Sequence, residues 1–365
     1  MSPTIAIAGG YTAGHLTPGF AIVQEFMNRS VSTECLFIGS GSGPERRIVE
    51  AEGIRFCSIP TAPFSCGGTV SKARAIAVIP RSASRAAAIL RSNRVTGLVL
   101  LGGHTSVGPA IAALRFSIPI YIIEPNASFG LANRLFVRFA ECIFIGDLYA
   151  DTVGNPNMLR MYATGVPVRN EIRTLHGRKK DPPIHSRPVR ILILGGSLGH
   201  GGLNMRIPAV CRFLADQGMS LDVHHQCGVG ADTGQLTKSY EDLGLRARVS
   251  DYIGEIHLAY SETDLAITAA GAITLSELAC AGIPSVIIPL SGAAASHQKE
   301  NARTYSRRTG SPVILEKDLS GPTLYACISD LIADPALWNA RSQSMYDAAR
   351  PDAAGLICKY LLREH

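Results

Sequence analysis

A histidine follows a glycine turn close to the start of the sequence, in a setting that suits group transfer. Residues 5–8 are apolar, Gly9 and Gly10 follow them, and His15 stands where the next helix is expected to begin. A turn of this kind brings backbone N–H groups close to a bound anion. Since an imidazole titrates near neutral pH, His15 could remove a proton from an attacking hydroxyl. It is our candidate for a general base; the alternative is a structural histidine that orders the turn through hydrogen bonds.

Two more glycine turns, both in the second half of the chain, suit a phosphate-bearing ligand. Residues 195–199 (Gly-Gly-Ser-Leu-Gly) and 271–277 (Gly-Ala-Ile-Thr-Leu-Ser-Glu) each follow an apolar run. The hydroxyls of Thr274 and Ser276 can donate to phosphate, and Glu277 can accept from two neighbouring ribose hydroxyls. A sugar nucleotide fits this set of groups. The alternative is an ordinary helix start in which Glu277 only interacts with the helix dipole.

Several other kinds of site are not expected. Neither half contains Gly-x-Gly-x-x-Gly or the P-loop pattern Gly-x-x-x-x-Gly-Lys-Ser/Thr, which argues against a nicotinamide dehydrogenase and a nucleotide hydrolase. His224, His225 and His257 have no carboxylates or cysteines at ligand spacing, so no metal site is predicted. The nine cysteines lack a Cys-x-x-Cys pair and indicate buried thiols.

The elements that must position these residues are predicted from hydrophobicity. Runs that are apolar throughout, instead of alternating, are typical of parallel strands buried on both faces by helices. The runs expected as strands are residues 4–8, 34–38, 54–59, 97–101, 118–123, 142–145, 189–194, 221–226, 247–250, 265–268, 285–289 and 312–315. Residues 170–188 are polar and contain prolines, as an exposed linker does. The sequence therefore predicts an α/β protein with two doubly wound parallel-sheet domains, residues 1–169 and 189–345.

Composition and charge narrow the expected partners. The chain has 365 residues, 46% of them hydrophobic and 18% charged, with no apolar run near the roughly 20 residues that span a bilayer and no room for a signal peptide. We therefore expect a cytoplasmic protein. The net charge of +6 is uneven, since residues 53–123 contain no Asp or Glu while Arg74, Arg81 and Arg85 flank the apolar residues 75–79. This predicts contact with an anionic membrane surface, with a solvated helix face as the alternative. Few aromatics and no binding module argue against nucleic acid.

Seven ordered motifs resemble glycosyltransferase family 28, and within it the N-acetylglucosaminyltransferases that convert lipid I to lipid II. They cover nearly the whole chain and lie at residues 8–19, 102–109, 124–126, 165–169, 195–199, 271–277 and 297–302. The resemblance implies the GT-B fold, in which two Rossmann-like domains face each other across a cleft. It also implies that residues 346–365 hold a helix, at residues 353–362, which packs back on the first domain.

The resemblance further implies an activity. N-acetylglucosamine would pass, with inversion, from UDP-N-acetylglucosamine to the 4-hydroxyl of the muramyl sugar in undecaprenyl-diphosphate-linked N-acetylmuramyl-pentapeptide. The first domain would bind this acceptor and the membrane, and the second would bind the UDP-sugar. Neither a metal nor another cofactor is implied, and the enzyme would lie peripherally on the cytoplasmic face of the inner membrane. His15 is the general base of this reaction by the same resemblance.

The family's ligand-binding positions correspond to a defined set of residues in this chain. They are Thr12, Ala13, Gly14, Asn126, Arg169, Ser197, Ile253, Ala272, Ile273, Thr274, Leu275, Ser276, Glu277 and Gln298. Ser197 corresponds to a diphosphate contact, Glu277 to the ribose contact and Gln298 to a donor-sugar contact. Ile253 corresponds to the position that holds uracil through its backbone, with core packing as the alternative. Arg169 could pair with phosphate or brace the joint between the domains.

Three departures from the family's pattern keep other functions open. One extra residue stands between Gly10 and His15, and residues 103–109 are one residue longer than expected. Ala269 and Ala270 stand where the family commonly has Arg-Ser. The alternatives are therefore a related UDP-sugar transferase with another lipid or small-molecule acceptor, and a non-catalytic homologue that binds a sugar nucleotide.

Overall fold

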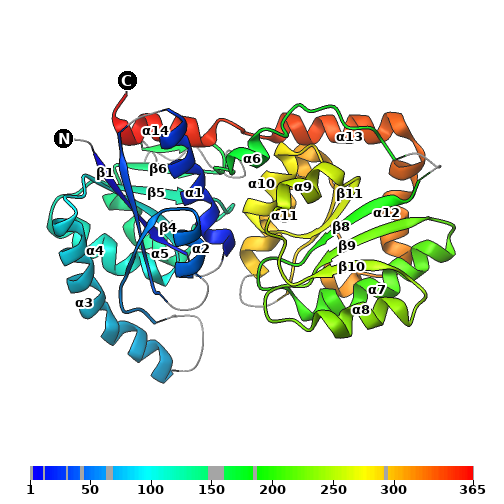
Figure 1. Cartoon of the computed structure of the whole chain (residues 1–365), viewed down its shortest axis with the longest axis horizontal. Helices are drawn as coiled ribbons and strands as arrows, with labels where there is room; N and C mark the ends of the chain where they lie inside the picture. Colours follow the sequence, from blue (N-terminus) through cyan, green and yellow to red (C-terminus); the bar gives the residue numbers. More distant parts are fainter. Residues whose placement is uncertain are drawn as a thin grey trace. The chain divides into compact units, whose positions relative to one another are not determined.

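The chain divides into two compact units. Met1–Asn170 and Arg350–His365 form the first unit, and Glu171–Ala349 forms the second (Figure 1). The computed structural model describes residues 3–10, 13–29, 32–41, 45–62, 69–146, 160–183, 187–291 and 295–364. Within these residues, no helix is both long and apolar enough to cross a bilayer.

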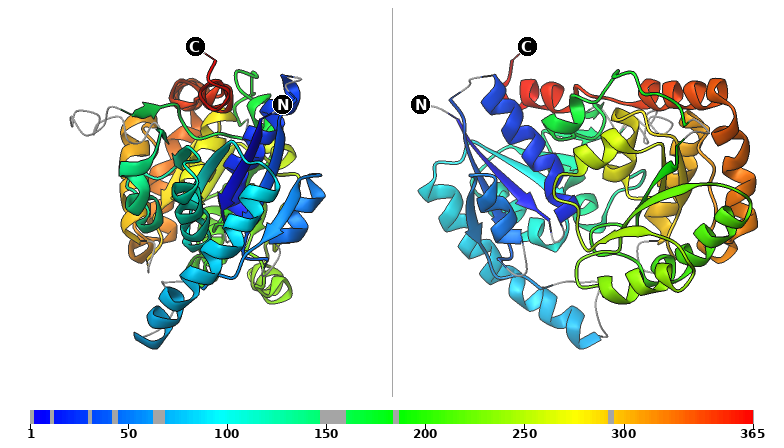
Figure 2. Two further views of the ribbon diagram at one scale, coloured as in Figure 1. Left: turned by 90° about the vertical axis from the view of Figure 1, so that its left-hand side faces the viewer. Right: turned by 45° about the vertical axis from the view of Figure 1, so that its right-hand side comes forward.

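The first unit is built on a parallel sheet with strand order β3-β2-β1-β4-β5-β6-β7. Its strands are β1 (Thr4–Gly9), β2 (Glu34–Gly39), β3 (Arg55–Ser58), β4 (Gly97–Gly102), β5 (Ile120–Glu124), β6 (Cys142–Ile145) and β7 (Met161–Ala163). Its α-helices are α1 (Ala13–Asn28), α2 (Glu45–Ala51), α3 (Thr69–Ser92), α4 (Val107–Arg115), α5 (Leu131–Phe136) and α14 (Ala353–Leu362). The first turns of α3 project away from the sheet (Figure 2). β1, β4, β5 and β6 are buried along their whole length, as their unbroken apolar sequences predicted.

Apolar clusters fill both sides of this sheet. Ile5 and Ile7 belong to a cluster that includes residues of α1 and α14, whereas Ala6 and Ala8 belong to one that includes residues of α3 and α4. Successive side chains of a strand point to opposite faces, so β1 contributes to both clusters. This two-sided burial is what continuous apolar runs predict.

Helix α14 completes one of these clusters. Ile357, Cys358 and Leu361 are buried in the same cluster as the apolar side chains of α1. Arg29, just after α1, donates from Nη2 to the carbonyl of Gly355 at 2.8 Å. The helix begins and ends at the residues that the sequence predicted.

The second unit holds a smaller parallel sheet with strand order β10-β9-β8-β11-β12. Its strands are β8 (Val189–Leu194), β9 (Leu221–Gln226), β10 (Ala247–Ser250), β11 (Leu265–Ala269) and β12 (Ser285–Ile288). Its longer helices are α7 (Gly201–Asp216), α8 (Thr233–Glu241), α9 (Ile256–Glu262), α10 (Ala272–Cys280), α11 (Ala295–Thr309), α12 (Gly321–Ala333) and α13 (Pro335–Ala348). The prediction of two doubly wound halves is therefore confirmed.

The strand expected at residues 312–315 is wrong. This segment makes only an isolated parallel bridge, between Ile287 and Val313. Ile287 donates to the carbonyl of Pro312 at 2.9 Å, and Ile314 donates back to Ile287 at 3.0 Å. Because Pro312 has no N–H group, the ladder cannot extend through it in both directions. A 3₁₀ turn at Glu316–Asp318 then ends the extended segment.

The segment between the two strand sets, residues 170–188, is partly buried rather than exposed throughout. It begins with the short helix α6 (Asn170–Arg173). Ile172 and Leu175 are buried there, and His176 contacts the carbonyl of Tyr346 in α13 through Nε2 at 3.3 Å. The contact of His176, together with a hydrogen bond from the Tyr346 hydroxyl to the carbonyl of Arg178 at 2.6 Å, attaches this segment to the second unit.

Candidate active site

The second unit brings its glycine turns together at the carboxyl edge of its sheet. Leu194, the last residue of β8, pairs in register with Gln226 of β9 and Thr268 of β11. Three neighbouring parallel strands thus end at one level, and the turns that follow them meet there. In open α/β sheets this edge is where ligands bind.

The first of these turns, residues 195–199, requires glycine for steric reasons. Gly196 and Gly199 have positive φ angles of 89° and 67°. A side chain on Gly199 would overlap the carbonyl of Cys227, and one on Gly228 would overlap Gly199. The turn lies just before α7, and Ser197 within the turn is half-buried. Close-packed backbone at a helix N-terminus is suited to a diphosphate.

Gln226 joins this turn to the segment around Ile253. The Ile253 N–H donates to Oε1 of Gln226 at 3.1 Å, and Nε2 of Gln226 donates to the carbonyl of Gly196 at 3.4 Å. Gln226 is only 7% exposed. Sequence reasoning missed this residue, although a polar side chain at the end of a buried strand is a usable signal. It links the expected uracil position to the expected diphosphate position.

The turn that precedes α10 offers mainly backbone groups. Ala272 and Leu275 are buried, while Ile273 and Thr274 are half-buried. The hydroxyl of Ser276 donates to the carbonyl of Ala272 at 2.9 Å, within the helix. The Ser276 proton is therefore already used, contrary to the expectation that it donates to phosphate. The hydroxyl of Thr274 and the first amides of α10 are the better donors.

Gln298 is held at the same edge by two backbone donors. Its Oε1 accepts from the N–H of Ala270 at 3.2 Å and from the N–H of Leu290 at 2.9 Å. Asn301 donates to the carbonyl of Ala270 at 3.0 Å. Nε2 of Gln298 makes no hydrogen bond to any described residue and remains a donor for a sugar hydroxyl. Ala269 and Ala270 are buried, so the turn they form supplies no cation.

Glu277 is buried with a tyrosine partner. Its side chain is 6% exposed, and Oε2 accepts a hydrogen bond from the hydroxyl of Tyr260 at 2.9 Å. Tyr260 belongs to α9 and is 1% exposed. Sequence reasoning found Glu277 but not Tyr260. A buried, hydrogen-bonded carboxylate of this kind can accept from a ribose hydroxyl with fixed geometry.

In the first unit, the expected catalytic turn lies at the carboxyl end of β1. Gly9 and Gly10 have positive φ angles of 141° and 93°. Thr105 donates to the carbonyl of Gly10 at 3.0 Å, and the hydroxyl of Ser106 lies between the carbonyls of Gly102 and Ala8, at 2.8 and 3.1 Å. The loop at residues 102–109 therefore contacts residues 8–10 at the end of β1, a contact that sequence reasoning did not find.

The predicted residues of this turn are described to different extents. α1 begins at Ala13, Gly14 is half-buried, and His15 occupies the first turn of the helix. Thr12 and the side chains of Ala13 and His15 lie outside the described part of the structure.

Asn126 and Arg169 occupy other loops of the first unit. Glu124, 2% exposed, accepts from the backbone N–H and Nδ2 of Asn126 at 3.2 and 3.0 Å. Its other oxygen accepts from Gly130 and Asn133 at 2.9 and 3.0 Å, which fixes the loop that carries Asn126. The buried Nε of Arg169 has no hydrogen-bond partner among the described residues. Within those residues there is also no cluster of three or more His, Cys, Asp or Glu side chains that could hold a metal.

Family models match both halves of the chain. Residues 5–145 match the glycosyltransferase family 28 N-terminal domain, and residues 190–356 match the glycosyltransferase family 28 C-terminal domain.

Relatives match over the full length. A protein of Geotalea uraniireducens (strain Rf4), named UDP-N-acetylglucosamine--N-acetylmuramyl-(pentapeptide) pyrophosphoryl-undecaprenol N-acetylglucosamine transferase, is 32% identical over 360 residues, which cover 99% of this chain and 98% of the relative. A protein of Geobacter metallireducens with the same name is 33% identical over 353 residues, covering 97% of this chain and 96% of the relative.

Solved structures share the fold. The crystal structure of Acinetobacter baumannii MurG superimposes with a TM-score of 0.75 at 23% identity, covering 99% of each chain. The UDP-GlcNAc 2-epimerase of Neisseria meningitidis, bound to UDP-GlcNAc, superimposes with a TM-score of 0.67 at 12% identity over 100% of both chains. The predicted fold class, two Rossmann-like parallel-sheet domains of the GT-B type, is confirmed. With both domains of one family in order along a single chain, the protein belongs to glycosyltransferase family 28.

Proposed function

We propose that this chain transfers N-acetylglucosamine from UDP-N-acetylglucosamine to the 4-hydroxyl of undecaprenyl-diphosphate-linked N-acetylmuramyl-pentapeptide, which converts lipid I to lipid II. The observation that carries the proposal is the set of groups at the carboxyl edge of the second unit. A glycine turn, the backbone carbonyl of Ile253, the buried carboxylate of Glu277 and the amide of Gln298 suit a diphosphate, a base, a ribose and a sugar in that order, while the Ile253 N–H is already bound to Gln226. The names and full-length match of the relatives support the same donor and acceptor.

The proposed chemistry is a single inverting displacement. His15 would take the proton of the acceptor hydroxyl as its oxygen attacks the anomeric carbon, and the bond to UDP breaks on the opposite face. The charge that develops on UDP would be stabilised by the N-terminal amides of α7 and α10 and by the hydroxyl of Thr274. These groups are fixed before the reaction, so they need no reorganisation during it.

Transfer to a lipid I analogue from UDP-N-acetylglucosamine tests this function directly. The His15→Ala variant should lose about 10²–10⁴-fold in kcat while UDP affinity stays within about threefold, because a general base acts only in the transition state. Full activity of His15→Ala would refute the assignment of the base. Turnover of the donor with a different acceptor would identify a related transferase, and UDP binding without turnover on any lipid acceptor would favour a binding protein.

We further propose that the protein binds peripherally to the cytoplasmic face of the inner membrane through α3. Arg74, Arg81 and Arg85 are exposed on this helix, and Ile76 between them is 60% exposed. Ala75, in contrast, is buried, so only part of the apolar stretch 75–79 could meet a membrane. Exposed cations beside an exposed apolar side chain are suited to an anionic leaflet.

Vesicle sedimentation tests this surface. Arg74→Glu combined with Arg81→Glu should abolish cosedimentation with vesicles that contain anionic lipid. Lys238→Glu with Arg246→Glu, two exposed positions in the second unit, makes the same change in net charge and should leave binding intact. Equal loss in both double variants would mean that net charge alone, and not α3, drives the association.

A further inference from the structure

We infer that Tyr260 is a positioning residue of the donor site, which holds the carboxylate of Glu277 for the nucleotide ribose and is itself held by Lys180. The inference rests on the proposed function, because it takes Glu277 as the ribose-binding group. It concerns only residues of the second unit. No residue of this set other than Glu277 was expected to serve the donor.

The contact between Tyr260 and Glu277 restrains the carboxylate. The phenol donates to Oε2 at 2.9 Å, and both side chains are almost fully buried, at 1% and 6% exposure. A hydrogen bond to a charged acceptor in such surroundings is stronger than one in water and fixes the rotation of the carboxylate. Recognition of a ribose diol depends on this orientation, because two neighbouring hydroxyls must meet the oxygens together.

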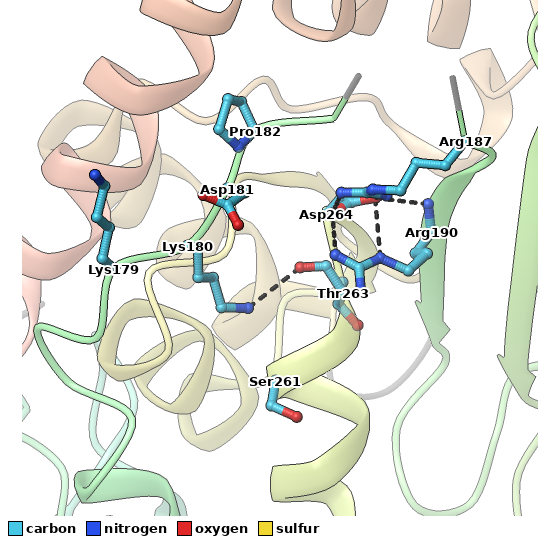
Figure 3. A pocket seen from close by; sticks show the side chains of 9 residues that line it. All are labelled: Lys179, Lys180, Asp181, Pro182, Arg187, Arg190, Ser261, Thr263 and Asp264. Carbon is cyan, nitrogen blue, oxygen red and sulfur yellow. Dashed lines mark hydrogen bonds and ion pairs between the residues drawn. The ribbon is translucent and has the colours of Figure 1, made fainter. Parts of the chain in front are cut away.

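Lys180 holds Tyr260 from the opposite end of the residue. Its Nζ donates to the backbone carbonyl of Tyr260 at 2.5 Å and to that of Thr263 at 3.2 Å. Figure 3 shows the ammonium group directed at Thr263 from the segment that precedes β8. These carbonyls end α9, where the helix dipole is negative and a cation is favourable. Lys180 thus adds a second donor to the Tyr260 carbonyl, which also accepts from the Thr263 N–H at 3.3 Å, and supplies a donor to the carbonyl of Thr263 at this helix end.

The surroundings of Lys180 agree with this role. Burial lowers the pKa of its ammonium to about 8, with Asp264 raising and Arg190 further lowering it. The neighbouring carboxylate of Asp264 is already bound by Arg187 and Arg190, so the two backbone carbonyls are the hydrogen-bond partners of Lys180. Tyr260 is consequently fixed at its backbone by Lys180 and at its hydroxyl by Glu277.

Discrimination between ribose and deoxyribose tests the inference. UDP, 2′-deoxy-UDP and 3′-deoxy-UDP are titrated into the full chain, and the ratio of affinities is compared between variants. Tyr260→Phe should weaken the binding of UDP about tenfold and that of the weaker-binding deoxy analogue less than about twofold. The ratio of the UDP affinity to the deoxy-analogue affinity should therefore fall. In turnover the loss should appear in KM for the donor and hardly in kcat, because the contact is made equally in the ground and transition states.

Further variants separate positioning from general damage. Tyr240→Phe removes another buried hydroxyl of the same unit, which bonds Nδ1 of His225 at 2.9 Å, and should leave the ratio unchanged. Lys180→Met should lower the ratio in the same direction, and Lys180→Arg should restore most of it. In a Glu277→Ala background, Tyr260→Phe should have no additional effect, since the group that it positions is absent.

Two results would overturn the inference. Equal weakening of UDP and both deoxy analogues by Tyr260→Phe would mean that the hydroxyl serves only the fold. A wild-type protein that binds UDP and both deoxy analogues equally would show that no ribose contact exists to be positioned. Failure of the proposed acceptor is distinguishable from both, because the nucleotide titrations require no lipid and give their answer even if lipid I is not a substrate.

Discussion

Replacing Asp264 by asparagine should destabilise the second unit by about 3 kcal/mol. The carboxylate is 1% exposed and accepts from the guanidinium groups of Arg187 and Arg190 and from the Arg190 backbone N–H (Figure 3). Asparagine has nearly the same size but removes the charge that compensates both arginines. Breaking a buried ion pair costs about 3–5 kcal/mol. We take the lower value because the arginine side chains are 28% and 37% exposed and can regain water.

The assay can use the one tryptophan of the chain. Trp338 is buried in the second unit and donates from Nε1 to the carbonyl of Asp264 at 3.0 Å, so its fluorescence reports unfolding at this place. For a unit of this size, about 3 kcal/mol corresponds to a fall of roughly 6–12 °C in Tm. The control is Asp216→Asn, which breaks an exposed pair with Arg212 and should cost under about 0.5 kcal/mol. A fall below about 2 °C, or one equal to that of the control, would refute the reasoning.

The same substitution has a predictable pH dependence. Burial alone would raise the pKa of the Asp264 carboxyl, but hydrogen bonds from Arg187 and Arg190 lower it below its usual value. A pKa that is lower in the folded state contributes stability above the unfolded-state pKa, and this is lost as pH falls through the folded-state pKa. The stability difference between wild type and Asp264→Asn should be constant between about pH 5 and 8 and shrink below about pH 4. A stability difference between wild type and Asp264→Asn that grows on acidification would contradict a lowered pKa for Asp264.

Three other predictions address the site, a helix start and a thiol. Gln226→Glu removes the donor to Gly196 and places a negative charge beside the expected diphosphate. UDP affinity measured by calorimetry should therefore fall at least about tenfold, whereas Gln235→Glu, at an exposed position, should leave it unchanged. Ser320→Ala removes a capping box with Thr323 at the start of α12 and should cost about 1 kcal/mol in urea unfolding; no change would mean that the box is not formed in solution. Burial raises the pKa of the Cys211 thiol to about 12, so at pH 8 iodoacetamide should modify Cys211 only after unfolding. Rapid labelling of Cys211 in the native protein would disprove its burial.

The fold followed from the sequence because its signal is local. A parallel strand covered on both faces must be apolar throughout, as residues 97–101 and 191–194 are, and few other structures require this pattern. The same rule failed at residues 312–315, where hydrophobicity is that of a strand but Pro312 cannot donate to a neighbour. Hydrogen-bonding capacity, not hydrophobicity, decided that segment.

The residues of the candidate site in the second unit stand out in the sequence, but their hydrogen-bond partners do not. Ser197 and Glu277 belong to glycine turns that the sequence displays directly. Gln226 and Tyr260 act on residues 27 and 17 positions away, through contacts that depend on how separate elements pack. The hydrogen bond from the Ser276 hydroxyl to the carbonyl of Ala272 likewise depends on the position of Ser276 one helical turn later. Sequence patterns locate the groups that we propose bind ligand more readily than the groups that orient them.

Because α14 is translated last, the first unit cannot complete its core until after the second unit has been synthesised. Ile357 and Leu361 of α14 belong to the same apolar cluster as α1. The whole second unit, roughly 180 residues, is synthesised after α1 and before α14. At about 5–20 residues per second, a ribosome needs roughly 10–40 s to cross that distance. During this interval the nascent first unit exposes the face of α1 that α14 later covers. The second unit can finish folding first, and the unfinished first unit is where a chaperone would bind or aggregation would start.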